Sequence, residues 1–215
     1  SSPTFSPFVH EPRVWALTNI RSIVNKREEF VLFLETHDLE IFALTETWLN
    51  HEPDGLFLPK EYQAFRCDRG SRGGGVALIS KKKLRVKQIS IPPEYKHIEI
   101  VCVDIYTDSS ICRAIIYYRP GGFNSESVDY TLKSIQCLTY LCNNTKLVCI
   151  MGDFNLPEMN WKNYSHPKNE IYNLFTSFID EMGLHQYVEL NLQLVNQTYL
   201  IYFSRMMLAF YHRFK

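Results

Sequence analysis

Short apolar runs of strand length alternate along this chain with longer stretches that repeat apolar residues at helical spacing. The strand-like runs cover 13–18, 40–45, 76–80, 84–91, 97–106, 111–118 and 147–151. Helical spacing predicts amphipathic helices over 24–36, 125–142 and 169–182. Because short turns join the runs between 76 and 118, we expect neighbouring strands there to pair antiparallel. The pattern predicts a mixed α/β fold in which helices cover sheets.

Length and composition favour one domain with a sizeable core. The chain has 215 residues, 46% of them hydrophobic, and we expect a single domain over 13–189. Residues 1–12 contain three prolines and are expected to be a disordered lead-in. No apolar run is long enough to cross a membrane, so no membrane partner is expected. The six cysteines form no Cys-x-x-Cys pair, which indicates buried thiols of an intracellular protein.

Polar side chains stand where several predicted strands leave the core. They are Asn19, Glu46, Tyr118, Asp153 and Asn155. Ligands bind open α/β sheets at the carboxyl ends of strands, and Mg²⁺ takes one or two carboxylates with water and phosphate oxygens. Each residue also has a structural interpretation, as a helix cap, an exposed acid, a core aromatic or a turn residue. Together they predict a site for a divalent cation and a phosphate.

Basic residues concentrate in one segment, although the formal net charge of the chain is zero. Eight Lys or Arg residues and one acid, Asp68, stand between Arg66 and Lys87. A basic stripe beside an acidic remainder favours binding of a polyanion such as nucleic acid. The alternative is a solvated hairpin edge, since lysines on an edge strand also prevent aggregation.

Five motifs occur in an order that resembles the endonuclease/exonuclease/phosphatase superfamily. They are Asn19-Ile20-Arg21-Ser22, Leu44-Thr45-Glu46-Thr47-Trp48-Leu49, Gly73-Gly74-Gly75-Val76-Ala77, Tyr118-Arg119-Pro120 and Gly152-Asp153-Phe154-Asn155. The sequences of these motifs are similar to those of the endonuclease domains of LINE-like, non-LTR retrotransposons of the Chicken-Repeat and jockey kind. The resemblance implies a four-layer α/β sandwich, with two mixed, mostly antiparallel sheets packed face to face and flanked by helices.

The resemblance also implies a role for each motif residue. Asn19 and Glu46 would hold Mg²⁺ or Mn²⁺, and Tyr118 would contact the scissile phosphate. Asp153 would transfer a proton, and Asn155 would orient the phosphate or the nucleophile. The substrate would be double-stranded DNA, nicked to leave a 3′-hydroxyl that primes reverse transcription. We expect DNA contacts from Arg69, Arg72, Lys81, Lys82, Lys83 and Arg119.

The end of the chain departs from the family pattern. After Glu189 the chain contains no Asp or Glu, and Ile201 stands where the family has an Asp. No Ser-Asp-His follows, and the neighbours of His212 do not match that motif. We therefore expect 190–215 to be an atypical, truncated or frameshifted end that lacks the last strand and leaves a sheet edge bare. Loss of the catalytic His–Asp pair predicts impaired activity.

Three functions stay open at this point. The first is a DNA endonuclease acting as a monomeric domain in the nucleus, with a reverse transcriptase domain downstream in a full-length element. The second is a phosphoesterase of the same superfamily that acts on another phosphate ester. The third is a catalytically dead retroelement remnant that binds DNA or nothing.

Overall fold

The structure is a computed structural model that describes residues 15–107, 110–143, 147–186 and 207–213. A sheet of four strands has the order β1-β2-β4-β3, formed by β1 (Trp15–Asn19), β2 (Ile41–Thr45), β4 (Val76–Lys81) and β3 (Tyr62–Cys67). A sheet of six strands has the order β5-β6-β7-β8-β10-β9. It is formed by β5 (Val86–Gln88), β6 (Ile100–Tyr106), β7 (Ile111–Tyr118), β8 (Leu147–Asp153), β10 (Met207–Arg213) and β9 (His185–Gln186).

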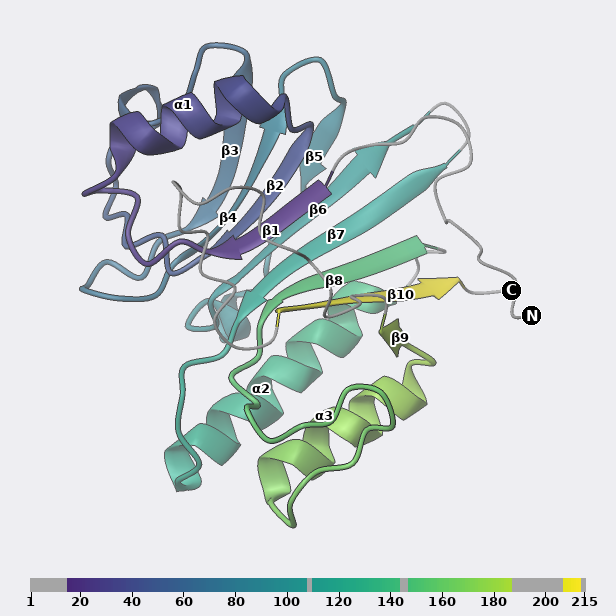
Figure 1. Cartoon of the computed structure of the whole chain (residues 1–215). Coiled ribbons are helices and arrows are strands. Elements are labelled where there is room, and N and C mark those ends of the chain that lie inside the picture. The colour runs from purple at the N-terminus through teal and green to yellow at the C-terminus, as the bar shows by residue number, and fades with distance from the viewer. Residues whose placement is uncertain (1–14, 108–109, 144–146, 187–206, 214–215) are drawn as a thin grey trace.

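The helices cover the outer faces of these sheets (Figure 1). The helix α1 (Arg27–His37) covers the four-stranded sheet, while α2 (Ser125–Cys142) and α3 (Glu170–Glu181) cover the six-stranded sheet. Two 3₁₀ turns, η1 (Asp54–Leu56) and η2 (Pro93–Tyr95), complete the described elements. The predicted four-layer α/β sandwich is confirmed.

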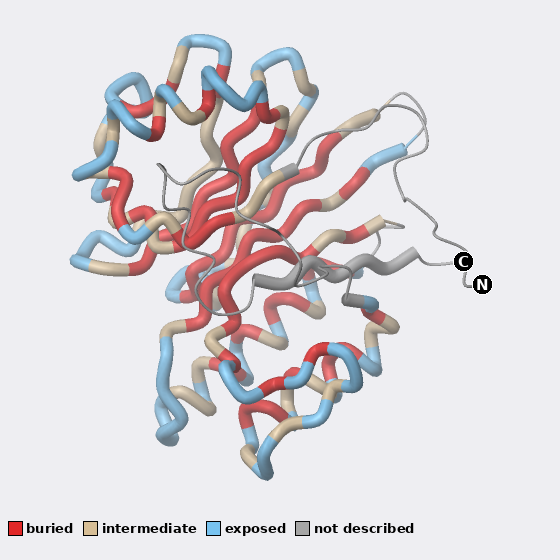
Figure 2. Tube along the Cα trace, viewed as in Figure 1, coloured by how far each residue is buried: buried red, intermediate tan, exposed pale blue. Residues whose placement is uncertain are grey.

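Alternation along the strands explains why the layers form. In β2, Phe42 and Leu44 pack under α1, whereas Ile41 and Ala43 face the core between the two sheets. Successive side chains of a strand point to opposite faces, so a strand that is apolar at every position is buried on both sides. Figure 2 shows these central strands buried, while exposed residues lie on the outer helices and loops.

Two parallel strand pairs determine where the polar strand ends meet. β1 pairs parallel with β2 and places Asn19 beside Thr45, and α1 is the connection between them. β7 pairs parallel with β8 and places Tyr118 beside Asp153, with α2 as the connection. Because parallel strands end at the same edge, each pair delivers its polar residues together.

Three strand predictions need correction. The runs at 76–80 and 84–91 do not pair with each other, because β2 and β3 occupy both edges of β4, and β5 pairs with β6 instead. The sequence interpretation also missed β3. The expectation of a missing last strand is wrong, since the backbone of β10 pairs antiparallel with β8 from Asp153 to Leu147.

Parts of the chain named in the sequence predictions lie outside the described residues. The lead-in at 1–12 is among them, and so is all of 190–215 apart from 207–213. Within the described part of the chain, no helix is both long and apolar enough to cross a membrane.

Candidate active site

Four of the predicted site residues converge where the two sheets meet. The Asn19 side-chain amide donates to Glu46 Oε1 and to Asp153 Oδ2, both at 3.0 Å. The Tyr118 hydroxyl donates to the same Glu46 oxygen at 3.3 Å. These residues come from the ends of β1, β2, β7 and β8, so both sheets contribute. The structure thus brings the ends of four strands together at one place.

Asn155 lies beside the site with its side chain turned towards the loop after β7. Its backbone N–H donates to Asp153 Oδ1 at 3.0 Å, and its side-chain amide donates to the Arg119 carbonyl at 2.6 Å. Asn155 has a φ of 49°, a left-handed conformation that Asn tolerates better than most residues. The turn thus fixes the Asp153 carboxylate and links it to the end of β7.

Glu46 is positioned by the glycine-rich segment Gly73–Gly75, which directly precedes β4. It has a φ of 53°, and the next two residues donate their backbone N–H groups to the carbonyls of Gly75 (3.3 Å) and Gly74 (3.0 Å). A side chain at Gly75 would place its Cβ 2.5 Å from Thr47 Oγ1. Gly75 is therefore required for the close approach that positions Glu46.

Burial changes the acidity of the site groups. Asp153 is 3% exposed, and burial, with help from the Glu46 charge, raises the pKa of its carboxyl from 3.8 to about 6. Hydrogen bonds from Asn19 and Asn155 oppose this shift. Burial and the nearby Glu46 and Asp153 carboxylates raise the pKa of the Tyr118 hydroxyl, so it stays a hydrogen-bond donor at neutral pH.

The oxygen atoms of the site fit a hard divalent cation. Asn19 Oδ1 is buried and has no hydrogen-bond partner among the described residues, beside the Glu46 carboxylate that accepts from the same amide group. No group of three or more His, Cys, Asp or Glu side chains placed to hold a metal occurs in the described segments. A cation held by Asn19 and Glu46 would complete its shell with water and substrate oxygens, as Mg²⁺ commonly does.

The raised pKa of Asp153 predicts a pH-dependent stability of the metal-free protein. The folded chain keeps a proton that the unfolded chain releases, so the Asp153 contribution is favourable below about pH 4 and declines as the pH rises through about 6. Between about pH 4 and pH 7 the free energy of unfolding should fall by on the order of 2 kcal/mol relative to Asp153→Asn. Chemical denaturation of both proteins in EDTA measures this difference, and a difference independent of pH would contradict the shift.

Arg119 does not face DNA, contrary to the sequence prediction. Its side chain is fully buried, and its guanidinium donates to the carbonyls of Phe154 (2.7 Å), Gly122 (2.9 Å) and Asn155. Those carbonyls belong to the loops that follow β7 and β8. Arg119 therefore ties the loop after Tyr118 to the loop after Asp153.

The predicted DNA contacts in the basic stripe are divided between two ends of the four-stranded sheet, while Lys87 lies in β5 of the other sheet. Arg69 lies near the site, with its guanidinium 5.6 Å from the centre of the Tyr118 ring, and Arg72 lies 5.9 Å from the Trp48 ring. Lys81 ends β4, roughly 16 Å along the strand, and Lys82 and Lys83 follow it. Only the arginine end of the stripe adjoins Glu46.

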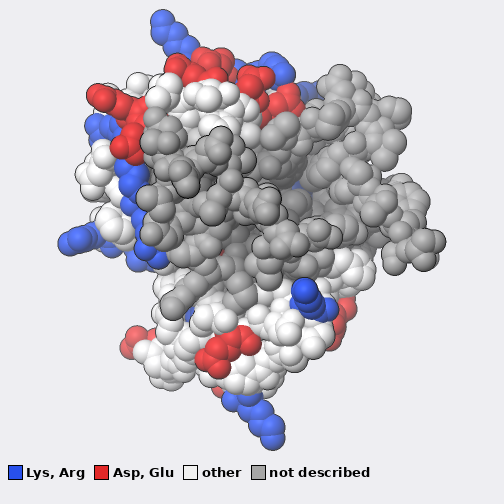
Figure 3. Space-filling view, viewed as in Figure 1, with Lys and Arg blue, Asp and Glu red and all other residues white. Residues whose placement is uncertain are grey.

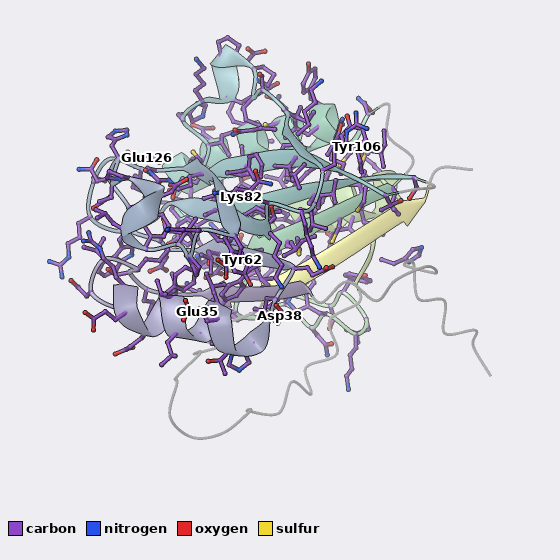
Figure 4. All side chains as sticks on the ribbon, turned by 90° about the horizontal axis from the view of Figure 1, so that it is seen from above. Glu35, Asp38, Tyr62, Lys82, Tyr106 and Glu126 are labelled. Carbon is purple, nitrogen blue, oxygen red and sulfur yellow. The ribbon has the colours of Figure 1, made fainter. Side chains whose placement is uncertain are left out.

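The three lysines also have partners of their own. Lys81 pairs with Asp38, Lys82 donates to the Lys60 carbonyl at 2.7 Å, and Lys83 pairs with Glu40 at 2.7 Å. In Figure 4, Asp38 lies at the end of α1, and Tyr62 is labelled between it and Lys82. Figure 3 shows acidic atoms gathered over the top of the molecule, where α1 lies in Figure 1. Asp38 and Glu40 offset the charges of Lys81 and Lys83, so this end of the sheet offers a polyanion little net positive charge.

Histidine does not complete the site within the described residues. None of the hydrogen bonds recorded there joins a histidine to Asn19, Glu46, Tyr118 or Asp153. In β10 the backbone of Met207 pairs with Asp153, whereas His212 pairs with Val148 at the other end of β8. His212 is thus separated from the site by roughly 16 Å of strand.

One residue at the site was missed by the sequence interpretation. Glu99 is 5% exposed, and its carboxylate accepts from Arg69 and from the Gly75 N–H. The signal was present, because Glu99 interrupts an apolar run at the start of a predicted strand. A charged residue in such a position must be paired to be buried.

Comparisons with known proteins place this arrangement among nucleases and phosphatases. The sequence matches the model of the Endonuclease/Exonuclease/phosphatase family over residues 17–185. No curated protein sequence matches the chain significantly.

Solved structures share the fold at low sequence identity. The endonuclease domain of TRAS1, a telomere-specific non-LTR retrotransposon, is 16% identical with a TM-score of 0.58, over 90% of this chain and 82% of that one. An AP endonuclease from Archaeoglobus fulgidus is 16% identical with a TM-score of 0.57, over 92% and 85%. The 3′ phosphatase NExo from Neisseria, bound to a product DNA hairpin, is 14% identical with a TM-score of 0.56, over 92% and 85%. With a family match over most of its length, the chain belongs to the Endonuclease/Exonuclease/phosphatase family.

Proposed function

We propose that this chain is a phosphodiesterase that nicks double-stranded DNA with Mg²⁺ or Mn²⁺, leaves a 3′-hydroxyl and turns over slowly. The observation that carries the proposal is the convergence of Asn19, Glu46, Tyr118 and Asp153 within hydrogen-bond distance of one another. The fold likeness to the TRAS1 endonuclease domain supports a retrotransposon origin. The 3′-hydroxyl would prime a reverse transcriptase of the same element.

Each residue has a task that its geometry allows. Asn19 and Glu46 would hold the divalent cation, which would polarise the phosphate and stabilise the charge that develops on it. Tyr118 lies beside Glu46 as a neutral donor and offers its hydroxyl to a phosphate oxygen. Asp153 is buried with a raised pKa, which suits a group that exchanges a proton near neutral pH.

We expect slow turnover because the sequence lacks the Ser-Asp-His motif that carries the catalytic histidine of the family. Without a positioned imidazole, no strong base prepares the attacking water, and general-base loss costs about 10²–10⁴-fold in rate. The same proposal takes 13–189 as a monomeric nuclease domain that acts in the nucleus of the host cell.

Relaxation of supercoiled plasmid tests the proposal. We expect slow conversion to open circles with Mg²⁺, none with EDTA, and nicks that a DNA polymerase extends without phosphatase treatment. Salt-dependent DNA binding without nicking would overturn the proposal and favour the binding-only remnant. Hydrolysis of small phosphate esters without plasmid nicking would favour the other phosphoesterase.

The division of the basic stripe predicts unequal effects of two matched substitutions. Arg72 and Lys82 are both exposed, but only Arg72 lies beside the site. Arg72→Gln should reduce the salt slope of DNA binding by about one, whereas Lys82→Gln should leave the slope and the Kd nearly unchanged. Fluorescence anisotropy over a salt series measures both, and equal losses would show that DNA also contacts the lysine end.

A further inference from the structure

Glu99 is a buried carboxylate that contacts both halves of the candidate active site. It stands directly before β6 and is 5% exposed. Oε1 accepts from Arg69 Nε at 2.7 Å and from Arg69 Nη2, while Oε2 accepts from the Gly75 N–H. Both arginine donors converge on one carboxylate oxygen, and these charge-assisted bonds hold the guanidinium at Glu99 while the other oxygen accepts from the backbone.

One connection runs from Glu99 to Glu46. The bond to the Gly75 N–H holds the glycine segment, whose carbonyls in turn accept from Thr47 N and Trp48 N. These two residues follow Glu46 directly and fix the left-handed turn in which Glu46 lies.

A second connection runs from Glu99 to Tyr118. The Glu99 carbonyl accepts from the Tyr118 N–H at 3.0 Å, and the anchored Arg69 guanidinium lies 5.6 Å from the centre of the Tyr118 ring. The hydroxyl of that ring donates to Glu46. The Glu99 carboxylate therefore holds the Arg69 guanidinium beside the Tyr118 ring.

We propose that Glu99 is a positioning residue that anchors Arg69 across the Tyr118 ring and thereby aligns the Tyr118 hydroxyl with Glu46 for phosphate binding. The inference rests on the proposed function for its catalytic meaning. Its structural content, the alignment of Tyr118, stands on the contacts of Glu99 alone. Glu99 acts through Arg69 and Tyr118 and does not itself touch the reacting atoms.

The chain offers a matched control in the strand that Glu99 directly precedes. Asp104 is 8% exposed in β6 and accepts from Arg113 Nε at 2.7 Å and Nη2 at 3.0 Å. It is also a buried carboxylate that accepts two bonds from an arginine, here one on each oxygen, but it lies towards the opposite end of β6 from Glu99. In Figure 4, Tyr106, which ends β6, lies far from Glu126 in the first turn of α2, the helix that follows Tyr118. Asp104→Asn therefore removes an equal charge without touching the site.

Kinetics of four variants test the proposal on the full chain. Glu99→Gln should lower the plasmid-nicking rate at saturating DNA by about 10–100-fold while changing the DNA Kd by less than about twofold. Asp104→Asn should keep the wild-type rate per folded molecule. Glu99→Gln combined with Tyr118→Phe should be no slower than Tyr118→Phe alone, because both changes disable the same group. Effects that multiply in the double variant would overturn the proposal, as would a lower melting temperature with unchanged turnover.

A spectroscopic readout separates this inference from the proposed function. With 3-fluorotyrosine incorporated, the ¹⁹F signal of Tyr118 is the one absent in Tyr118→Phe. Glu99→Gln should shift or broaden that signal, and Asp104→Asn should not. An unmoved signal would overturn the positioning role even if the enzyme nicks DNA. Absence of nicking by the wild-type chain would refute the proposed function, while the ¹⁹F signal would still decide the role of Glu99.

Discussion

Replacing Gly152 with alanine is expected to cost about 3 kcal/mol or more of the free energy of unfolding, at the upper end for overpacked sites. Gly152 lies in β8, and its neighbour across the parallel ladder is Tyr117 of β7. A Cβ built at Gly152 would overlap the Tyr117 carbonyl oxygen and lie 2.7 Å from the carbonyl carbon. Backbone atoms in the middle of a sheet cannot move aside as a flexible side chain can. The two strands would have to separate at the point where they deliver Tyr118 and Asp153.

A second glycine provides the control for this change. A Cβ at Gly55, in η1, would have no atom within 4 Å. Gly55→Ala should therefore keep the free energy of unfolding within about 0.5 kcal/mol of the wild type, as is usual for substitutions on the surface. Urea denaturation followed by circular dichroism measures both variants. Equal stability of the two would show that β7 and β8 can separate at Gly152 at little cost.

The strand ends of the site could be predicted because they depend on local pattern alone. Apolar runs that finish at Asn19, Glu46 and Asp153 define strands, and strand ends in such a fold face one edge. The helix over 169–182 follows the same logic, since its apolar spacing gives α3 over Glu170–Glu181. These features require no knowledge of which strands are neighbours.

Other features depend on contacts between distant segments and escaped prediction. β4 and β5 are consecutive but lie in different sheets, because β4 has no free edge. Arg119 belongs to a recognisable motif, but the motif does not reveal that its guanidinium turns inward to three backbone carbonyls. The basic stripe is continuous in sequence, yet the strand β4 carries it from one end of the sheet to the other. The sequence therefore predicted a basic surface, but the direction of β4 determines which of its basic residues lie beside the site.

Glu46→Gln is expected to lower plasmid nicking by about 100-fold or more. The substitution removes the negative charge that the divalent cation needs, and the cation supplies the charge stabilisation of the reaction. Glutamine keeps one oxygen, which can still accept from Asn19 or Tyr118, so the fold should be retained. The melting temperature in EDTA should stay close to that of the wild type, and the increase on adding Mg²⁺ should be lost.

Glu40 is the matched control, because it precedes β2 just as Glu46 follows it. Its carboxylate pairs with Lys83 at the opposite end of the sheet, so Glu40→Gln should nick at the wild-type rate and keep the Mg²⁺-dependent rise in melting temperature. Comparing the two variants thus tests whether a glutamate supports nicking only at the end of β2 that lies in the candidate site. If Glu46→Gln nicked as fast as Glu40→Gln, the carboxylate at this strand end would not hold the cation, and the convergence of Asn19, Tyr118 and Asp153 around it would have a purely structural meaning.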